Sequence, residues 1–168
     1  MKKGAWKVWL KRTVLFLVLL PFVFIAGYIL YELVGIAVNH HATDCQTKEL
    51  VSVIKAAVAG ADVMDTYSET GNTSGTGNHV DMLSVVVFRT KEKGKELEKN
   101  IEEGVKTFSE VDEWGFYVES IEAIESNKKT KEWVPGYYDK LSLPEDKTDC
   151  YLVYLCNAAP FEDNIEGH

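Results

Sequence analysis

The hydrophobic positions of this chain begin with one uninterrupted apolar segment near the N-terminus. Residues 13–31 carry no charge over 19 positions, close to the roughly 20 apolar residues that a helix needs to cross a bilayer. Pro21 lies inside this segment, and membrane helices tolerate proline. The pattern predicts a membrane-spanning helix from Thr13 to Tyr31, within a signal-anchor and juxtamembrane stretch that covers residues 13–38.

Basic residues are concentrated before this span. Residues 1–12 contain five of the 18 Lys and Arg residues and no Asp or Glu. Because basic segments stay on the cytoplasmic side of a membrane, we expect this basic head inside the cell and all that follows the span outside. Aromatic side chains, which favour both membrane interfaces, stand near the two ends of the span: Trp6, Trp9, Tyr28 and Tyr31.

A cleaved signal peptide has the same charge pattern and is the alternative interpretation. Signal peptides carry about 7–15 apolar residues and a small-x-small cleavage site. The span here is longer, and residues 32–44 contain no Ala-x-Ala sequence. We therefore favour an uncleaved signal-anchor, with Glu32 at its outer edge.

From Thr43 onward, apolar residues recur every three or four positions, as on one face of a helix. These residues are Leu50, Ile54, Ala57, Ala61 and Met64. Thr43 and Gln46 have the spacing of a helix-capping box. We expect a helix from Thr43 to about Tyr67 and then a polar loop over residues 68–78, which contain no apolar side chain.

Three later segments have the composition of strands. Residues 79–89 are apolar on both faces of their central part apart from Ser84, which predicts an interior strand. Residues 113–125 alternate and then change parity, which predicts a strand with a bulge or bend near Ser120. Residues 150–156 form a third apolar run of strand length.

A second amphipathic helix is expected at residues 91–108, between the first two strands. The strand–helix–strand order implies a right-handed crossover, with the last strand antiparallel to the others or between them. Both helices then cover one face of the sheet. The predicted fold is an α/β (α+β) domain over residues 43–168: a small two-layer α/β sandwich of order α-β-α-β-β that follows the N-terminal transmembrane helix.

The charge of this domain is opposite to that of the basic head. Residues 40–168 contain 13 Lys and Arg against 25 Asp and Glu, a net charge of −12. Such a surface repels nucleic acid and anionic lipid headgroups. We therefore expect no nucleic-acid partner; the expected partners are the lipid bilayer, through residues 13–31, and a membrane or extracellular protein.

All three cysteines follow the span, where an extracytoplasmic location permits disulfides. On one strand Cys150 and Cys156 would lie about 20 Å apart, at 3.3 Å per residue. Bridged Cα atoms are usually less than about 7 Å apart. A disulfide would therefore join Cys45 to Cys150 or Cys156, and three free thiols are the alternative.

Residues 68–73, Ser-Glu-Thr-Gly-Asn-Thr, resemble the phosphate loop of flavodoxins, which cradles the phosphate of FMN. In that family the loop follows a strand and opens a helix whose N-terminus holds the phosphate. Here a predicted helix precedes the segment and a strand follows it, so we expect no cofactor. The polar loop is still the predicted binding region, through Thr70, Asn72, Thr73, Asn78 and His79.

Aromatic residues flank a Pro-Gly turn at positions 135–136. Exposed, their rings would stack on sugars or peptides; buried, they would cover the open face of the sheet. These further candidate ligand-binding residues are Trp133, Tyr137 and Tyr138.

Motifs for metal binding and catalysis are absent from the sequence. His40, His41 and Asp44 do not have the spacing of a structural zinc site, and we expect a juxtamembrane hinge there. The sequence contains no Gly-x-Ser-x-Gly and no His-Glu-x-x-His. The sequence thus indicates a single-pass, membrane-anchored extracytoplasmic protein with a non-enzymatic binding or assembly domain. A small extracytoplasmic enzyme or cofactor-binding domain that uses the segment from Ser68 to His79 is the alternative.

Overall fold

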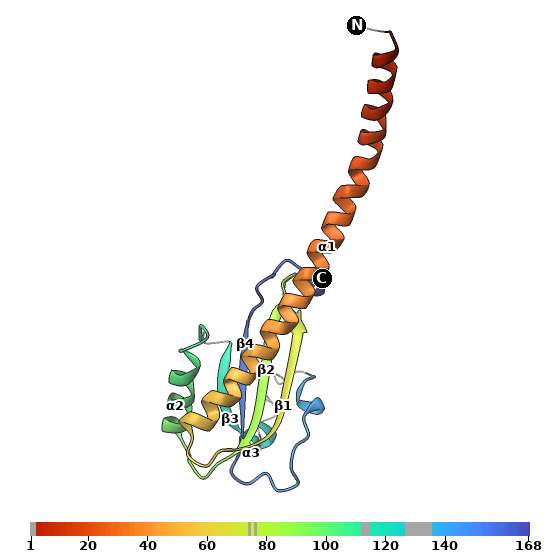
Figure 1. Ribbon diagram of the computed structural model, residues 1–168. Helices are drawn as coiled ribbons and strands as arrows, with labels where there is room; N and C mark the ends of the chain where they lie inside the picture. Colours follow the sequence, from red (N-terminus) through yellow and green to blue (C-terminus); the bar gives the residue numbers. More distant parts are fainter. Residues whose placement is uncertain (1–2, 74, 76, 112–114, 127–135) are drawn as a thin grey trace.

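The computed structural model describes residues 3–73, 75, 77–111, 115–126 and 136–168. A long helix projects from a small α+β domain built on one four-stranded sheet (Figure 1). The helices and strands are, in chain order, α1 (Lys3–Ala57), β1 (Asp62–Gly71), β2 (Asp81–Arg89), α2 (Lys95–Val105), β3 (Phe116–Ser120), α3 (Ile121–Ser126) and β4 (Cys150–Ala158). Two short 3-10 helices span Tyr138–Lys140 and Ile165–Gly167.

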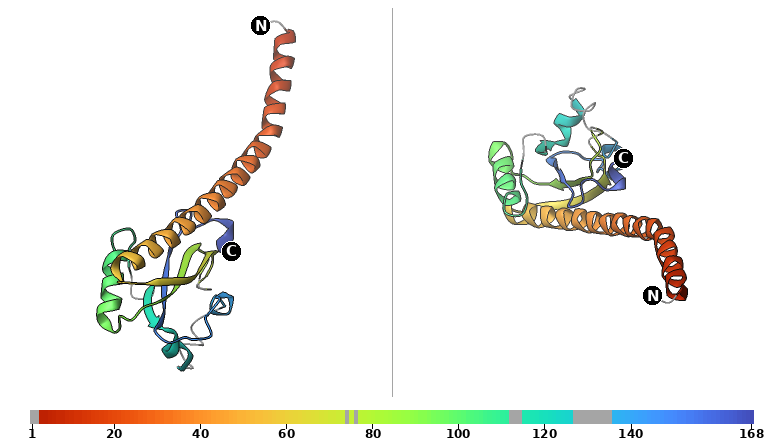
Figure 2. Two further views of the ribbon diagram at one scale, coloured as in Figure 1. Left: turned by 60° about the horizontal axis from the view of Figure 1, so that its bottom comes forward. Right: turned by 90° about the horizontal axis from the view of Figure 1, so that it is seen from above.

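Helix α1 is one continuous element of 55 residues. Its N-terminal part is exposed and points away from the domain. It contains a window of mean hydropathy 2.6, and within the described residues α1 is the one helix long and apolar enough to cross a membrane. The helix bends in its N-terminal third, which contains Pro21 (Figure 2), because proline removes a backbone hydrogen bond and clashes with the preceding turn.

One side of α1 is buried from the end of the predicted span to the end of the helix. We call this the buried stripe: Glu32, Gly35, Asn39, Thr43, Gln46, Leu50, Ile54 and, directly after the end of the helix, Val58. Steps of three and four residues keep these positions on one face of a helix. The first five are polar or glycine, and the last three are aliphatic. The same helix face is therefore polar near the apolar segment and hydrophobic at the far end of the domain.

Two expectations about this region are wrong. The helix does not start at Thr43, and no hinge separates it from the span. Thr43 does not cap a helix; its hydroxyl lies 3.0 Å from the carbonyl oxygen of Asn39 and 2.7 Å from the hydroxyl of Thr70. The spacing that resembles a capping box arises because polar side chains on the buried stripe bond to the sheet.

The end of α1 also differs from the prediction. The helix stops at Ala57 rather than near Tyr67, and Gly60 follows with a φ of 71°, a conformation that favours glycine and ends helices. Ala61 and Met64, which fit the helical period, lie after this stop, and Met64 belongs to β1. Ala61 and Met64 fit the three-residue step of a helix, although the chain at Met64 is a strand.

The sheet has the strand order β1-β2-β4-β3, and every neighbouring pair is antiparallel. Strand β2 is interior, as predicted. The last strand both lies between the two earlier ones and runs antiparallel to them, with a β2–β4 register from Asp81 opposite Ala158 to Arg89 opposite Cys150. The crossover through α2 therefore joins two parallel strands that are not adjacent.

The parity change near Ser120 marks the end of a strand rather than a bulge. Strand β3 ends at Ser120, and α3 begins at the next residue. The Ser120 hydroxyl accepts a hydrogen bond from the backbone N–H of Ala123, 3.2 Å away, as an N-cap does. The change of parity near Ser120 therefore does mark a change of structure, but it is the start of a helix, which the sequence analysis did not predict.

Each face of the sheet has its own hydrophobic cluster. Helices α1 and α2 cover one face together, as predicted, with Leu50, Ile54, Leu97 and Ile101 packed on Val86, Phe88, Val153 and Leu155. Helix α3 and residues 137–141 cover the other face, over Leu83, Val85, Val87 and Leu152. Figure 2 shows α1 lying along one side of the sheet and α3 on the opposite side.

The last ten residues fasten the domain to the near end of the buried stripe. We call residues 159–168 the C-terminal clamp. Asn39, fully buried, exchanges two hydrogen bonds with the backbone of Phe161, at 3.0 and 2.9 Å. The Glu32 carboxylate accepts from the side chain of Asn164 at 2.8 Å and from the backbone N–H of Ile165 at 3.0 Å. A carboxylate at the end of the apolar segment is thereby buried and paired.

Close approach of the clamp requires glycine at position 35. A Cβ atom there would lie 2.5 Å from the side-chain nitrogen of Asn164, the same nitrogen that donates to Glu32. A Cβ atom at Gly27, eight residues earlier in α1, would meet no heavy atom within 4 Å. Packing therefore demands glycine at position 35 and not at position 27.

We predict that Gly35→Ala destabilises the domain although alanine favours helix by about 1 kcal/mol over glycine. Displacing the Asn164 amide leaves the buried Glu32 carboxylate short of a donor, a loss of about 1–3 kcal/mol. Thermal unfolding of the full chain in detergent micelles, followed by circular dichroism, measures the effect. Gly27→Ala is the matched control. Equal unfolding temperatures for the two variants would contradict the role given to the clamp.

Candidate functional site

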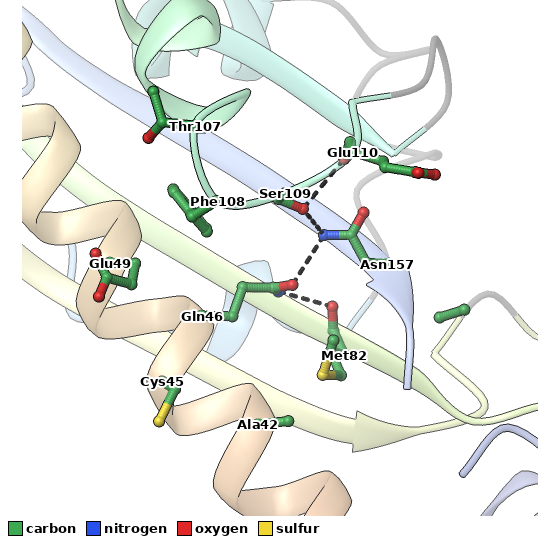
Figure 3. A pocket seen from close by; sticks show the side chains of 11 residues that line it. Ala42, Cys45, Gln46, Glu49, Met82, Thr107, Phe108, Ser109, Glu110 and Asn157 are labelled. Atoms are coloured by element: carbon green, nitrogen blue, oxygen red, sulfur yellow. Dashed lines mark hydrogen bonds between the residues drawn. The ribbon is translucent and has the colours of Figure 1, made fainter. Parts of the chain in front are cut away.

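A groove opens on the α1 side of the sheet, between α1 and the segment after α2 (Figure 3). Its volume is about 740 Å³. Helix α1 forms one wall, residues 107–110 form the other, and the ends of β2 and β4 form the floor. The lining residues are Ala42, Cys45, Gln46, Glu49, Met82, Thr107, Phe108, Ser109, Glu110, Asn157 and Ala158.

Side-chain amides at the bottom of the groove hold its walls together. The side-chain amide of Asn157 lies 2.8 Å from the side-chain amide of Gln46 and 2.6 Å from the Ser109 hydroxyl. Gln46 in turn donates to the carbonyl of Met82 and to the hydroxyl of Ser84, both at 3.0 Å. Three elements and the 107–110 segment thus meet in one hydrogen-bonded set (Figure 3), which fixes the shape of the groove before anything binds.

The accessible groups of the groove are different from those at its bottom. Two exposed carboxylates, Glu49 and Glu110, stand on opposite walls, and the exposed thiol of Cys45 lies on α1. Half-buried Phe108 and Met82 supply apolar surface between them. Such a groove suits a segment that carries both a basic and an apolar side chain.

The segment expected to be a binding loop is largely used in structure. Residues up to Gly71 are part of β1, so the prediction of a loop from residue 68 is wrong. The Thr70 hydroxyl is bonded to α1 through Thr43 at 2.7 Å, and the Asn72 side chain donates to the carbonyl of Gly77 at 2.7 Å. Asn78 is exposed. The last part of β1, residues 68–71, was not recognised in the sequence because it contains no apolar residue.

The resemblance to the flavodoxin loop does not extend to the structure. A strand, β1, does precede Asn72, as in that family. The chain then turns into the antiparallel strand β2 instead of a helix. Within the described residues, β1 is thus followed by a strand and not by the helix whose N-terminus holds the phosphate in flavodoxins.

Chemically diverse side chains do gather where this hairpin turns. His79, whose side chain is 38% exposed, lies 3.1 Å from the carboxylate of Asp81. The Thr73 hydroxyl donates to the other oxygen of that carboxylate at 3.2 Å and lies 3.6 Å from the Cys156 sulfur. An imidazole, a carboxylate, a hydroxyl and a thiol therefore lie in sequence across the ends of β2 and β4.

The aromatic candidates cover the sheet, as one of the two interpretations of their sequence predicted. Tyr137 is 3% exposed and Tyr138 is 9% exposed; Trp133 lies outside the described residues. Tyr137 is hydrogen-bonded to Tyr117 and packs near Tyr154, with ring centroids 5.7 Å apart. These side chains form a tyrosine layer over one sheet face and present no stacking platform.

Burial changes the acidity of this layer. Loss of hydration raises the pKa of Tyr137, Tyr154 and Tyr117 above the usual value, since a phenolate is disfavoured there. Burial together with the nearby Glu125 carboxylate raises the pKa of Tyr138 to about 12. The pKa values of Tyr67 and Tyr151 are shifted in the same direction, chiefly by burial.

The cysteines and the juxtamembrane histidines do not form the sites considered for them. No disulfide joins the three cysteines, in agreement with the alternative of three unbridged thiols. The sheet separates Cys45 on α1 from Cys150 and Cys156 on the opposite face. His40 bonds to Glu166 at 2.7 Å. His41 lies 3.7 Å from the Cys45 sulfur. Among the residues placed in the structure, no three His, Cys, Asp or Glu side chains are arranged to hold a metal ion.

Sequence reasoning missed the groove and the clamp. The sequence pattern suggests a capping role for Gln46, and no local signal singles out Asn157 or Ser109. A signal was present in the spacing of polar residues along α1, because Glu32, Asn39, Thr43 and Gln46 continue the helical period of the aliphatic residues after them. A polar stripe that extends a hydrophobic one indicates buried hydrogen bonds.

We predict that the domain loses stability above pH 10, where unfolded tyrosine ionises. All six tyrosines after the span have a raised pKa, so the folded state holds these protons more tightly. The contribution of these tyrosines to the free energy of unfolding is complete below pH 10. It falls as the pH rises toward their pKa values in the folded state, about 12 for Tyr138.

Tyrosinate absorbance and circular dichroism, followed together during an alkaline titration of the full chain in micelles, measure this effect. The phenol groups should ionise with the loss of the native spectrum, and Tyr154→Phe should flatten the decline. Ionisation of all of them near pH 10 in a native domain would contradict the tyrosine layer.

No protein-family model, no curated protein and no solved structure matches the chain. The apolar part of α1, the groove and the C-terminal clamp are therefore the features from which its function has to be inferred.

Proposed function

We propose that this chain is a single-pass membrane protein that holds a non-enzymatic binding or assembly domain against the outer face of the membrane. Residues 1–12 are cytoplasmic, residues 13–31 span the bilayer, and the domain is extracytoplasmic. The groove beside α1 receives a segment of a protein partner.

The charges and the apolar segment support the anchor and its orientation. Five basic residues and no acidic ones precede the span, in agreement with a cytoplasmic N-terminus. The helix that contains the span is exposed throughout residues 21–31, and such an apolar surface needs a lipid or protein environment.

The single observation that carries the proposal is the unbroken buried stripe of α1. The helix that is apolar enough to span a membrane also supplies a wall of the groove and bonds to β1, to β2 and to the C-terminal clamp. A domain tethered only for retention needs no more than a flexible linker. A domain built on the anchor itself has a fixed height and orientation, as a module that assembles with another membrane-bound or surface protein requires.

The groove favours a basic partner segment. Its two accessible carboxylates belong to a domain with a strong negative charge, and complementary charge both attracts and orients a partner. The amides below them already bond to one another and to β2, so the groove offers a shaped surface rather than a reactive centre.

The alternative, a small extracytoplasmic enzyme or cofactor-binding domain, is favoured by one observation: the alignment of His79, Asp81, Thr73 and Cys156. A half-exposed imidazole oriented by a carboxylate is a common part of general acid–base sites. A turnover by the full chain that His79→Ala abolishes, with the native fold retained, would establish this alternative in place of the binding role.

We predict that Cys45 reacts from outside the cell. It is exposed on α1 beyond the span, whereas Cys150 is buried and Cys156 half-buried. A membrane-impermeant maleimide applied to intact expressing cells should label the protein, and Cys45→Ser should remove most of the label. Labelling that occurs only after permeabilisation would refute the orientation.

The same thiol tests the groove. We predict that a photoreactive maleimide on Cys45, irradiated in native membranes, forms an adduct of defined mass. Charge reversal by Glu49→Lys with Glu110→Lys should lower its yield, since the basic segment is then repelled. Glu96→Lys, on the exposed side of α2, is the control reversal, and Lys91→Cys in a Cys45→Ser background is the control position. Equal yields from all of these proteins would contradict a partner in the groove.

A further inference from the structure

One exposed apolar residue of the domain lies apart from the helix. Outside α1, the described part of the chain has a single exposed large hydrophobic side chain, Ile165, which is 55% exposed. Ile165 belongs to the C-terminal clamp, and its backbone N–H donates to the Glu32 carboxylate at 3.0 Å. The one exposed large apolar side chain of the described domain outside α1 therefore belongs to a residue that contacts Glu32, directly after the predicted span.

The clamp also meets the last aromatic ring of the span. The rings of Phe161 and Tyr31 lie 5.5 Å apart, and tyrosine at the end of a span favours the membrane interface. Phe161 is half-buried and is held there by the two hydrogen bonds between its backbone and Asn39. The apolar surface of α1 thus continues onto the clamp through Tyr31, Phe161 and Ile165.

Distances along the helix give the depth of these residues. At 1.5 Å per residue, residues 13–31 cover about 28 Å, which matches the roughly 30 Å hydrocarbon core. Glu32 then lies about 1.5 Å and Gly35 about 6 Å beyond the span, inside a headgroup layer of about 5–8 Å per leaflet. Because Ile165 and Asn164 contact Glu32 directly, they lie at this depth as well.

The burial of Glu32 makes this position compatible with lipid. Its side chain is paired with Asn164 and the residue is only 7% exposed, so α1 presents no acidic group to its surroundings until Asp44. Two exposed carboxylates of the clamp, Glu162 and Asp163, would oppose entry into hydrocarbon but remain hydrated among headgroups.

We propose that the C-terminal clamp is a second membrane contact, in which Ile165 and Phe161 lie in the headgroup layer of the outer leaflet against phospholipid. This inference rests on the proposed anchor. The occupant is the lipid surface, because the exposed residue continues the apolar surface of the span at the depth where that span ends. The domain is then held at the membrane by two points, the helix and the clamp.

The test uses the full chain in phosphatidylcholine nanodiscs with an environment-sensitive fluorophore on Ile165→Cys, in a Cys45→Ser background. Lys91→Cys in the same background is the control. Lys91 is exposed and lies near the end of α1 that is far from the span, because the neighbouring Glu92 accepts a hydrogen bond from the backbone of Ala59, just beyond that end. That end lies about 38 Å along the helix from Glu32. Each protein is probed with aqueous iodide and with phospholipids that carry a nitroxide near the headgroup.

We expect the label at position 165 to emit at shorter wavelength than the label at position 91, to be quenched by the nitroxide lipid and to be protected from iodide. Quenching by iodide but not by the nitroxide would overturn the lipid contact. Protection from both quenchers would also overturn it, in favour of a second copy or another protein over the clamp.

A separate measurement tests the proposed membrane anchor independently of the proposed lipid contact of the clamp. Each labelled protein is first tested for co-flotation with phosphatidylcholine vesicles and for resistance to extraction at alkaline pH. A chain that fails to float refutes the anchor and the lipid contact together. A chain that floats and resists extraction but has a water-exposed label at position 165 refutes the lipid contact alone.

Discussion

The packing of one face of α1 against the sheet is the interaction on which the rest of the structure depends. The buried stripe from Glu32 to Val58 gives the sheet its main cover and gives the groove its wall. It also gives the clamp its attachment point. Its aliphatic end contributes hydrophobic burial, about 1.5–3 kcal/mol for each fully buried Leu, Ile or Val. Its polar end contributes little net energy for each hydrogen bond but strongly disfavours other arrangements, since a misplaced helix would leave Glu32, Asn39 and Gln46 buried without partners.

The two halves of the stripe therefore have different tasks. Hydrophobic side chains hold α1 to the sheet without fixing its exact position along the axis. The polar half fixes that position, because each amide or carboxylate bonds to particular partners: Gln46 to β2 and β4, Asn39 to Phe161 and Glu32 to Asn164. These bonds tie residues more than 30 positions apart in the sequence, so the end of the chain must be in place before the near end of the helix is satisfied.

The sequence alone predicted the elements whose hydrophobic pattern is long and regular. The apolar segment, the interior strand β2 and the helix α2 follow from periodicity. Chain topology left the last strand either antiparallel to the earlier strands or between them, and the structure shows both. The end of the first helix, expected near Tyr67, could not be predicted in this way because Met64 fits both a helical and a strand period. The end of β3 at Ser120 was missed because the change of parity there, caused by the start of α3, was interpreted as a bulge. The groove and the clamp were missed for a different reason: their residues are polar, and polar residues are placed by partners distant in the chain. No local pattern identifies Asn157 as the partner of Gln46, or Asn164 as the partner of Glu32.

The continuity of α1 has a mechanical consequence. Apart from the bend near Pro21, α1 continues without a break from the predicted span into the domain, and its 55 residues extend over about 80 Å. If the proposed span crosses the bilayer, a change in the tilt of α1 after Pro21 is transmitted to the domain: a 10° rotation about Glu32 displaces the far end of the domain by roughly 6–7 Å, over the 38 Å of helix beyond that residue. Tilt responds to bilayer thickness, because a helix leans when its apolar length exceeds the hydrocarbon core. The groove, which lies partway along this lever, would therefore be presented at different heights and angles in membranes of different thickness.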